Sequence, residues 1–159
     1  MKAIALFSGG LDSTLAMKMI IDQGIDVLAI NISTGFGSTK DRREHMQNMC
    51  NQVGAELRII DIQSEFLQDV LFDHKHGYGK NFNPCIDCHG KMFRIAGEEV
   101  RKGNYDILAT GEVLGQRPFS QNKDALGRVQ VLAGVDILRP LSAKLLPETS
   151  YEREGLVDR

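Results

Sequence analysis

The sequence predicts a doubly wound α/β domain, in which a five-stranded, mainly parallel sheet carries helices on both faces. Two observations predict this class. Short apolar runs alternate along the chain with segments whose apolar residues recur at helical spacing. The first apolar run leads through a glycine-rich turn into the first helical segment, as expected of a βαβ unit. The chain has 159 residues, so it is the size of one domain and can bury a full core.

The first βαβ unit is predicted within residues 3–32. Residues 3–7 are apolar throughout, which is typical of a strand that is buried on both faces. Residues 14–21 have helical composition, and Gly24 can end that helix. Residues 25–32 are again apolar and predict the second strand.

The later elements continue the alternation. Residues 40–53 are polar apart from an apolar stripe at helical spacing, so they predict a helix that covers the sheet. On that stripe we expect Cys50 to be a small core residue. Ser64 is expected to cap a short helix over residues 65–72. The remaining predicted elements are strands at residues 56–62, 105–110 and 136–141 and helices at residues 84–100 and 122–132.

Charge and composition exclude several classes of protein. The 19 Lys and Arg residues nearly balance the 21 Asp and Glu residues, which gives a net charge of −2 and no bulk attraction for nucleic acid. No apolar run approaches the roughly 20 residues that a membrane span requires, so we expect no membrane partner. The N-terminus begins directly with a strand instead of a signal peptide, which predicts a cytoplasmic protein. The three cysteines do not resemble a disulfide framework and indicate reactive thiols or a metal site.

Residues 8–13, Ser-Gly-Gly-Leu-Asp-Ser, join the first strand to the first helix. Two glycines let the backbone turn sharply and approach a ligand, while the helix N-terminus offers free N–H groups and a positive dipole end. Ser8 and Ser13 add hydroxyl groups. This is chemistry for a phosphate, and Asp12 could hold the Mg²⁺ that accompanies phosphates. The segment is neither a Walker A loop, which closes with Lys-Ser/Thr, nor the dinucleotide fingerprint, which has a third glycine.

Two further segments follow strands at their carboxyl ends, the edge at which open parallel sheets bind ligands. Residues 31–39 follow the second strand and either contact adenine or ribose or form a solvated connection; Asn31 and Thr34 are the candidate contacts. Gly111 follows the strand at residues 105–110, where it would let the backbone approach a nucleotide. Residues 73–83 are basic, aromatic and aperiodic, so they predict either a loop that contacts RNA or substrate or a plain crossover.

Cys85 and Cys88 lie on the first turn of a predicted helix that starts at Pro84. At positions i and i+3 they share one face, and the helix dipole stabilises thiolates there. Three interpretations are open: a nucleophile that carries a persulfide, with its resolving partner; an iron–sulfur cluster completed by Cys50; or a zinc site with Cys50 and a histidine such as His89. A fourth zinc ligand is not evident, so we rank the catalytic thiol first, the cluster second and zinc third.

Several motifs resemble the ATP pyrophosphatases of the PP-loop family. The Ser-Gly-Gly-x-Asp-Ser segment directly after the first strand resembles their pyrophosphate loop. Residues 94–96, 109–116, 120–121 and 138–141 resemble, in order and spacing, the catalytic domain of tRNA 4-thiouridine synthetases. The Asn-Pro-Cys-x-x-Cys segment at residues 83–88 is instead similar to the related tRNA 2-thiouridylases, in which a cysteine near this point receives sulfur.

The resemblance implies a Rossmann-like fold of the adenine nucleotide alpha hydrolase type, with ATP and Mg²⁺ across the carboxyl ends of the first and fourth strands. It implies that a uridine carbonyl oxygen in tRNA is adenylated with release of pyrophosphate, and that sulfur then displaces AMP. The sulfur donor would be a cysteine desulfurase or sulfide, and a homo-oligomer is compatible with the family. The residues expected to be catalytic are Cys88, Cys85 and Asp12, and the expected ATP contacts are Ser8, Gly9, Gly10, Asp12, Ser13, Asn31, Thr34, Gly111 and Gln116.

Two other functions stay open at this point. An amide-forming ATP pyrophosphatase would share the phosphate loop, but amidation needs no thiol, so the Cys-x-x-Cys argues against it. A nucleotide-binding module that senses ATP without turnover would use the cysteines for a structural metal. We expect residues 1–159 to form one catalytic domain in the N-terminal part of a longer protein. RNA affinity is expected in a domain beyond Arg159 or in a partner subunit, since a net charge of −2 equips the chain poorly to hold tRNA.

Overall fold

The computed structural model describes residues 1–33, 40–66 and 85–159, and for residues 40–41, 65–66 and 85–88 it describes the backbone alone. Thr34 and the predicted loop at residues 73–83 therefore lie outside the described residues. Strands and helices alternate through most of the chain, as predicted. In chain order the elements are β1 (Lys2–Leu6), α1 (Leu11–Ile21), β2 (Asp26–Ser33), α2 (Lys40–Val53), β3 (Glu56–Asp61), α3 (Gln63–Phe66), α4 (Cys85–Arg101), β4 (Ile107–Thr110), α5 (Lys123–Ala133), the 3₁₀ helix η2 (Pro140–Leu145) and α6 (Ser150–Arg153).

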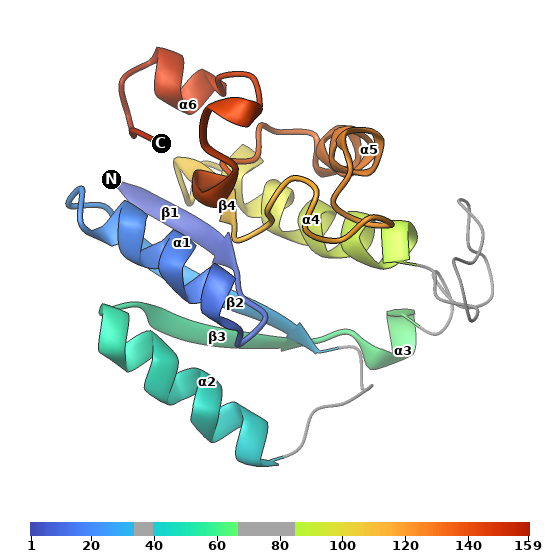
Figure 1. Ribbon diagram of the computed structural model, residues 1–159. Helices are drawn as coiled ribbons and strands as arrows, with labels where there is room; N and C mark the ends of the chain where they lie inside the picture. Colours follow the sequence, from blue (N-terminus) through green and yellow to red (C-terminus); the bar gives the residue numbers. More distant parts are fainter. Residues whose placement is uncertain (34–39, 67–84) are drawn as a thin grey trace.

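The sheet has four strands among the described residues, in the order β3-β2-β1-β4, and all of its pairs are parallel (Figure 1). The chain winds outward in two directions from the central strand β1, because β2 lies on one side of it and β4 on the other. This is the predicted doubly wound arrangement. The carboxyl ends of β1 and β4 are neighbours, and in such sheets ligands bind at the edge where the winding changes direction.

The predicted fifth strand at residues 136–141 is the point at which the structure differs from the expectation. Leu138 forms one parallel bridge to Ala109: its N–H donates to Leu108 O at 2.8 Å, and its carbonyl accepts from Thr110 N at 3.0 Å. Pro140 follows two residues later and begins η2. Because proline has no N–H to donate to a ladder, the pairing ends after a single bridge instead of extending to a strand.

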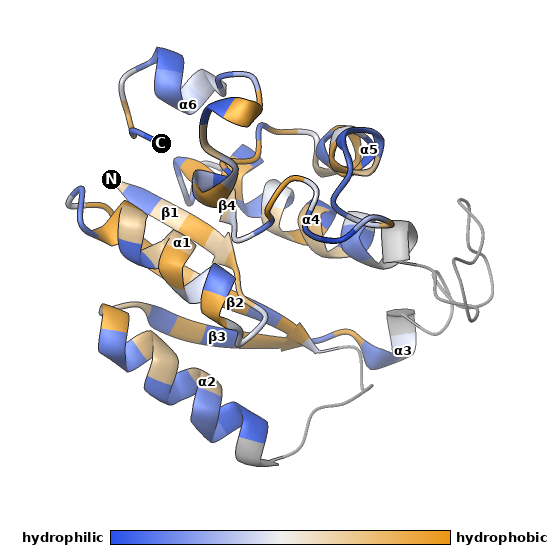
Figure 2. Cartoon of the chain, in the orientation of Figure 1, coloured by the Kyte–Doolittle hydropathy of each residue, from blue (hydrophilic) through white to orange (hydrophobic). Residues whose placement is uncertain are grey.

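Helices cover both faces of the sheet, and two hydrophobic clusters fill the space between them. The cluster on one face contains Ala3 and Ala5 of β1 with residues of α1 and α2; the cluster on the other face contains Ile4 of β1 with residues of α4 and α5. The strand side chains thus alternate between the two faces, as the pleat requires. Figure 2 shows the resulting pattern, with apolar central strands and helices that turn a polar side outward.

The predicted helices vary in how well their ends match the structure. The bounds of α2 agree with the prediction, and α5 begins at Lys123, after Asn122, whose side chain accepts from Ala125 N at 2.9 Å. The helix predicted at residues 65–72 starts earlier, since α3 begins at Gln63. Ser64 therefore lies inside the helix, and it is Asp61 Oδ1 that accepts from Gln63 N, at 2.9 Å.

No helix in the described part of the chain combines the length and the apolar composition that a membrane crossing needs.

Candidate functional site

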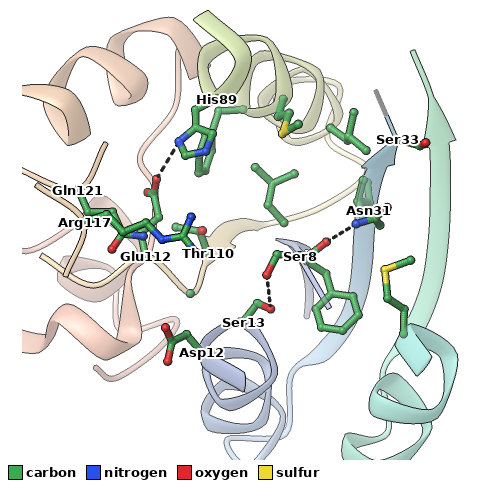
Figure 3. A pocket seen from close by; sticks show the side chains of 18 of the residues that line it. Ser8, Asp12, Ser13, Asn31, Ser33, His89, Thr110, Glu112, Arg117 and Gln121 are labelled. Atoms are coloured by element: carbon green, nitrogen blue, oxygen red, sulfur yellow. Dashed lines mark hydrogen bonds and ion pairs between the residues drawn. The ribbon is translucent and has the colours of Figure 1, made fainter. Parts of the chain in front are cut away.

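A cavity of about 330 Å³ opens at the carboxyl edge of the sheet (Figure 3). Residues from five places in the chain line it: the β1–α1 loop, the end of β2, the first half of α2, the start of α4, and the segment that follows β4. Two groups of these residues differ in their surroundings. We call Ser8, Asp12, Ser13 and Arg42 the loop wall, and His89, Glu112 and Gln121 the deep wall.

Hydrogen bonds within the β1–α1 loop fix the loop wall. The Ser8 and Ser13 hydroxyls lie 3.2 Å apart, and Ser8 Oγ also accepts from Gly10 N at 3.3 Å. The Ser13 and Thr14 hydroxyls both donate to Gly10 O, at 3.0 and 2.9 Å. Gly10 is the N-cap of α1, so the loop passes directly into a helix N-terminus whose first N–H groups have no partner within the helix.

Helix α2 braces this loop from outside. Arg42 Nη2 donates to Ser8 O at 3.1 Å, and His45 Nε2 lies 3.2 Å from Gly9 O. Gly9 has a φ of +81°, and a Cβ at this position would lie 2.9 Å from Met46 Cγ. The loop therefore requires glycine here, both for the left-handed backbone and for the approach of α2.

The end of β4 packs directly on the first turn of α1. A Cβ on Gly111 would lie 2.5 Å from both the N and the Cα of Ser13. The sequence predicts that this glycine allows a close backbone approach, and in the described structure the backbone that it approaches is that of α1. Because glycine has no side chain, the segment that follows β4 can contact the first turn of α1 directly at this position.

A buried ion pair anchors the deep wall. Arg139 Nε donates to Glu112 Oε2 at 2.9 Å, and the two side chains are 4% and 7% exposed. Arg139 Nη2 also donates to Leu126 O at 3.3 Å. The other carboxylate oxygen, Glu112 Oε1, is buried and has no hydrogen-bond partner among the described residues. Leaving a buried acceptor unpaired costs about 1–3 kcal/mol, and more when the group is charged.

His89 faces this free oxygen from α4. Its Nδ1 lies 3.8 Å from Glu112 Oε1, which is too long for a hydrogen bond, and Nδ1 is likewise buried without a partner. Burial lowers the pKa of His89; the Glu112 carboxylate raises it and Arg117 lowers it further, and the net shift is downward. The imidazole is therefore neutral near pH 7, and the 3.8 Å approach is not an ion pair.

The structure places most of the predicted ATP contacts around the cavity. Gly9 and Gly10 belong to the loop, and Asn31 Nδ2 donates to Phe7 O at 2.8 Å, which ties the end of β2 to the end of β1. Thr34 cannot be placed, as it lies outside the described residues. The predicted contacts whose residues line the cavity are Ser8, Asp12, Ser13, Asn31, Gly111 and Gln116.

Several residues that line the cavity are not among the contacts predicted from the sequence, and four of them, Arg42, His89, Glu112 and Gln121, belong to the two walls. Glu112 and Gln121 lie within the motifs that resemble 4-thiouridine synthetases, so those motifs were a signal for them. Gln121 Oε1 is a third buried atom without a partner in the described part of the chain. His89 was considered only as a metal ligand. Arg42 lies in a helix of mixed polar residues, where nothing in the sequence distinguishes it from its neighbours.

Cys50 and helix α4, which carries Cys85 and Cys88, lie on different sides of the sheet. Cys50 is fully buried in the cluster between α2 and the sheet, and burial raises the pKa of its thiol to about 11. α4, which begins at Cys85, packs on the opposite face. Cys50 is thus a core residue, as its apolar stripe predicts. The side chains of Cys85 and Cys88 lie outside the description, and the described side chains include no group of three or more His, Cys, Asp and Glu that could hold a metal ion.

The chain matches one protein-family model over most of its length. The family model described as thiamine biosynthesis protein (ThiI) matches residues 1–144. The chain belongs to the ThiI family. This membership confirms the resemblance to PP-loop ATP pyrophosphatases that the sequence motifs indicate.

Similar proteins include tRNA-specific 2-thiouridylases of two bacteria. The tRNA-specific 2-thiouridylase MnmA of Treponema denticola is 29% identical over an alignment of 173 positions, which covers 97% of this chain and 47% of that protein. MnmA of Helicobacter hepaticus is 29% identical over an alignment of 162 positions, which covers 96% of this chain and 45% of that protein. The chain thus spans about half the length of these two relatives.

Solved structures confirm the fold. A 4-thiouridine synthetase in complex with RNA and bound ATP superposes with a TM-score of 0.72 and 23% identity, over 89% of this chain and 36% of that one. The U34-tRNA thiolase NcsA from Methanococcus maripaludis, solved with its [4Fe-4S] cluster, gives a TM-score of 0.55 and 19% identity, over 92% of this chain and 53% of that one. At these identities the likeness establishes the shared Rossmann-like architecture.

Proposed function

We propose that this chain is the ATP-binding catalytic domain of an enzyme that thiolates uridine in tRNA. The observation that carries the proposal is the position of the Ser-Gly-Gly-Leu-Asp-Ser loop. It matches the pyrophosphate loop of the PP-loop family, and it forms one wall of a cavity at the ligand-binding edge of the sheet. The names of the relatives support the substrate, since they are 2-thiouridylases and a 4-thiouridine synthetase that act on tRNA or bind RNA.

The loop wall suits the triphosphate of ATP. The amides of Gly9, Gly10 and Ser13 and the N-terminus of α1 supply N–H groups and a positive dipole end. Arg42 adds a cation beside the loop, to which it is already anchored through Ser8 O. These groups would stabilise the charge that develops on the departing pyrophosphate.

Asp12 is the residue that would hold Mg²⁺. Its carboxylate belongs to the first turn of α1 and lines the cavity, and carboxylate oxygens are the kind of ligand that Mg²⁺ prefers. When bound, the ion would neutralise charge on the phosphates.

The nucleoside would lie between the ends of β1, β2 and β4. Asn31, Thr34, Gly111 and Gln116 are the proposed contacts from these segments. Gln121 joins them, because its buried Oε1 needs a hydrogen-bond donor and a nucleoside offers amino and hydroxyl groups.

The proposed reaction has two steps. The uridine carbonyl oxygen attacks the α-phosphorus of ATP, so that a P–O bond forms and the bond to pyrophosphate breaks. Sulfur then attacks the activated carbon, and AMP leaves with the original oxygen. Cys88 is proposed to present that sulfur as a persulfide, whose outer sulfur it receives from the persulfide of a cysteine desulfurase. Cys85 then attacks the sulfur of Cys88, which releases thiouridine and leaves a Cys85–Cys88 disulfide for a thiol reductant to reduce. Sulfide, as the other possible donor, would attack the activated carbon directly. A sulfide bound to a cluster is the alternative that the NcsA structure favours.

The test is direct production of thiouridine. The chain is incubated with ATP, Mg²⁺, a cysteine desulfurase with L-cysteine, a thiol reductant and an unmodified tRNA transcript, and the digested RNA is analysed by mass spectrometry. We expect thiouridine together with equal amounts of AMP and pyrophosphate, and loss of all three products in Asp12→Ala. ATP binding without AMP formation would contradict the proposal and favour a nucleotide-sensing module.

The cysteines are tested in the same assay. Cys88→Ser is expected to keep the ATP affinity of the parent and to lose thiolation. Cys85→Ser is expected to lose the release of thiouridine from Cys88, so that repeated turnover stops. Full thiolation by both variants would remove the cysteines from the mechanism. If either variant loses bound iron that the anaerobically prepared parent contains, the cysteines hold an iron–sulfur cluster, and the cluster takes the place of the persulfide in the proposed mechanism.

A further inference from the structure

One oxygen of the Glu112 carboxylate is bonded by Arg139, and the other makes no hydrogen bond to the described residues. Arg139 binds Oε2 through Nε and is itself fixed by Leu126 O at 3.3 Å and by Gln130 Oε1 at 3.4 Å. Because the guanidinium is held from three sides, it fixes the position of Glu112 Oε2. Oε1 is consequently directed away from Arg139, at the cavity that Glu112 lines.

Two unpaired buried atoms meet at this place. Glu112 Oε1 and His89 Nδ1 lie 3.8 Å apart, and neither has a hydrogen-bond partner among the described residues (Figure 3). Buried polar atoms in folded proteins are nearly always paired, so an unpaired set at the edge of a cavity indicates the position of a ligand. The Glu112 side chain is only 7% exposed, so bulk water is not a ready partner.

The two atoms restrict the chemistry of that ligand. Glu112 Oε1 can only accept, so the ligand must present an N–H or O–H donor. A phosphate presents neither and would be repelled by the carboxylate; phosphates therefore belong to the loop wall. In the tautomer with its proton on Nδ1, His89 donates, and the group that it meets is an acceptor. The pair thus fits a neutral donor beside an acceptor.

We propose that Glu112 and His89 form the subsite for the target base and select uracil by its imide edge. Glu112 Oε1 accepts the ring N3–H, and His89 Nδ1–H donates to a neighbouring carbonyl oxygen. Cytosine has an acceptor at N3 and would leave two acceptors opposed. Arg139 is a positioning residue, because it acts only by orienting Glu112. This inference rests on the proposed function, since that function supplies uridine as the acceptor.

The test compares nucleosides on the wild-type chain in the presence of ATP and Mg²⁺. Affinities for uridine, N3-methyluridine and cytidine are measured by ligand-observed NMR. Uridine is expected to bind at least about tenfold more tightly than the other two, as for other sites where a missing donor leaves a charged partner unpaired. Equal affinities, or no uridine binding, would overturn the proposal.

A variant separates Glu112 from the shape of the cavity. In Glu112→Gln the amide oxygen can pair with Arg139, which places an NH₂ donor where Oε1 stood. The preference for uridine over N3-methyluridine is expected to fall to about twofold or less, while ATP affinity is kept. Glu98→Gln, an exposed carboxylate on α4, is the matched control and should keep the full preference. Should Glu112→Gln fail to fold, the comparison of nucleosides on the wild type decides the matter without it.

Further outcomes distinguish this inference from the proposed function. Thiouridine formation together with equal binding of uridine and N3-methyluridine would overturn the subsite alone. A strong uridine preference without thiouridine formation would overturn the proposed function alone. Zinc ions are the remaining probe, added first to the chain alone and then to the chain with uridine. If Zn²⁺ binds wild type but not Glu112→Gln and displaces uridine, the two atoms form a metal site and the base subsite is overturned.

Discussion

The two walls of the cavity differ in how their polar groups are satisfied. In the loop wall the serine hydroxyls bond to each other and to the loop backbone; Ser8 is exposed to solvent, and Ser13 is buried but fully bonded. In the deep wall Glu112 and Gln121 are buried, and each keeps one oxygen without a partner among the described residues. A satisfied, solvated wall can receive a charged ligand at little cost, whereas a desolvated wall with unpaired acceptors gains most from a neutral donor. The walls therefore divide the ligand chemistry of the cavity.

The largest effect is expected where the deep wall is anchored. Arg139→Met leaves the carboxylate of Glu112 buried without its partner, so we expect a loss of about 3–5 kcal/mol in the free energy of unfolding. Urea denaturation measures it. The double variant Arg139→Met, Glu112→Leu removes both charges and should recover most of the loss. A single variant as stable as wild type would mean that the ion pair does not hold this wall.

The contact between the walls gives the next largest effect. In Gly111→Ala the new methyl group would overlap the backbone of Ser13, so we expect a loss of about 1–3 kcal/mol together with weaker ATP binding. The control is Gly127→Ala in α5, where a Cβ meets nothing within 4 Å. That change should stabilise the protein by about 0.5–1 kcal/mol, because alanine favours a helix over glycine. Equal effects of the two substitutions would contradict the close packing at Gly111.

Gln121 tests whether an unpaired acceptor is retained for binding. Gln121→Leu removes a buried oxygen that has no partner in the described structure, so we expect the free energy of unfolding to stay the same or rise by about 1 kcal/mol. ATP affinity should instead fall by roughly fivefold, the value of one hydrogen bond. Calorimetric titration and thermal unfolding measure the two quantities. Gln47→Leu, on the exposed face of α2, should leave ATP affinity unchanged; a loss of stability in Gln121→Leu without a loss of affinity would assign Gln121 to the fold.

The smallest effect concerns the thiol in the core. Burial raises the pKa of Cys50 to about 11, so at pH 7.5 almost no thiolate is present and the native protein should not be alkylated there. Iodoacetamide labelling followed by peptide mass spectrometry measures this, with a urea-unfolded sample as the control that should be labelled. Labelling of Cys50 in the native state at the rate of a free thiol would show that the core between α2 and the sheet opens.

The sequence predicts those parts of the molecule that depend on local pattern. Alternating apolar runs and helical spacing predict the parallel sheet and the bounds of α2, and the two glycines and serines predict the loop. The prediction of a fifth strand is wrong because Pro140 ends the ladder after the bridge at Leu138. The apolar run at residues 136–141 does not reveal this effect. The deep wall could not be derived from spacing, since Glu112 and Arg139 meet across 27 positions and their burial depends on how α4 and α5 pack.

The most direct test of the division between the walls uses the two halves of ATP as separate probes. Inorganic pyrophosphate and adenosine are titrated in turn into isotope-labelled protein with Mg²⁺, and NMR follows the amides of Gly9, Gly10 and Ser13 and the side chains of His89 and Gln121. We expect pyrophosphate to shift the three loop amides and to leave the His89 and Gln121 signals in place, and we expect adenosine to shift the Gln121 signal, since Gln121 is a proposed nucleoside contact. If pyrophosphate shifts the His89 and Gln121 signals as strongly as the loop amides, or shifts neither set, the assignment of the phosphates to the loop wall is wrong.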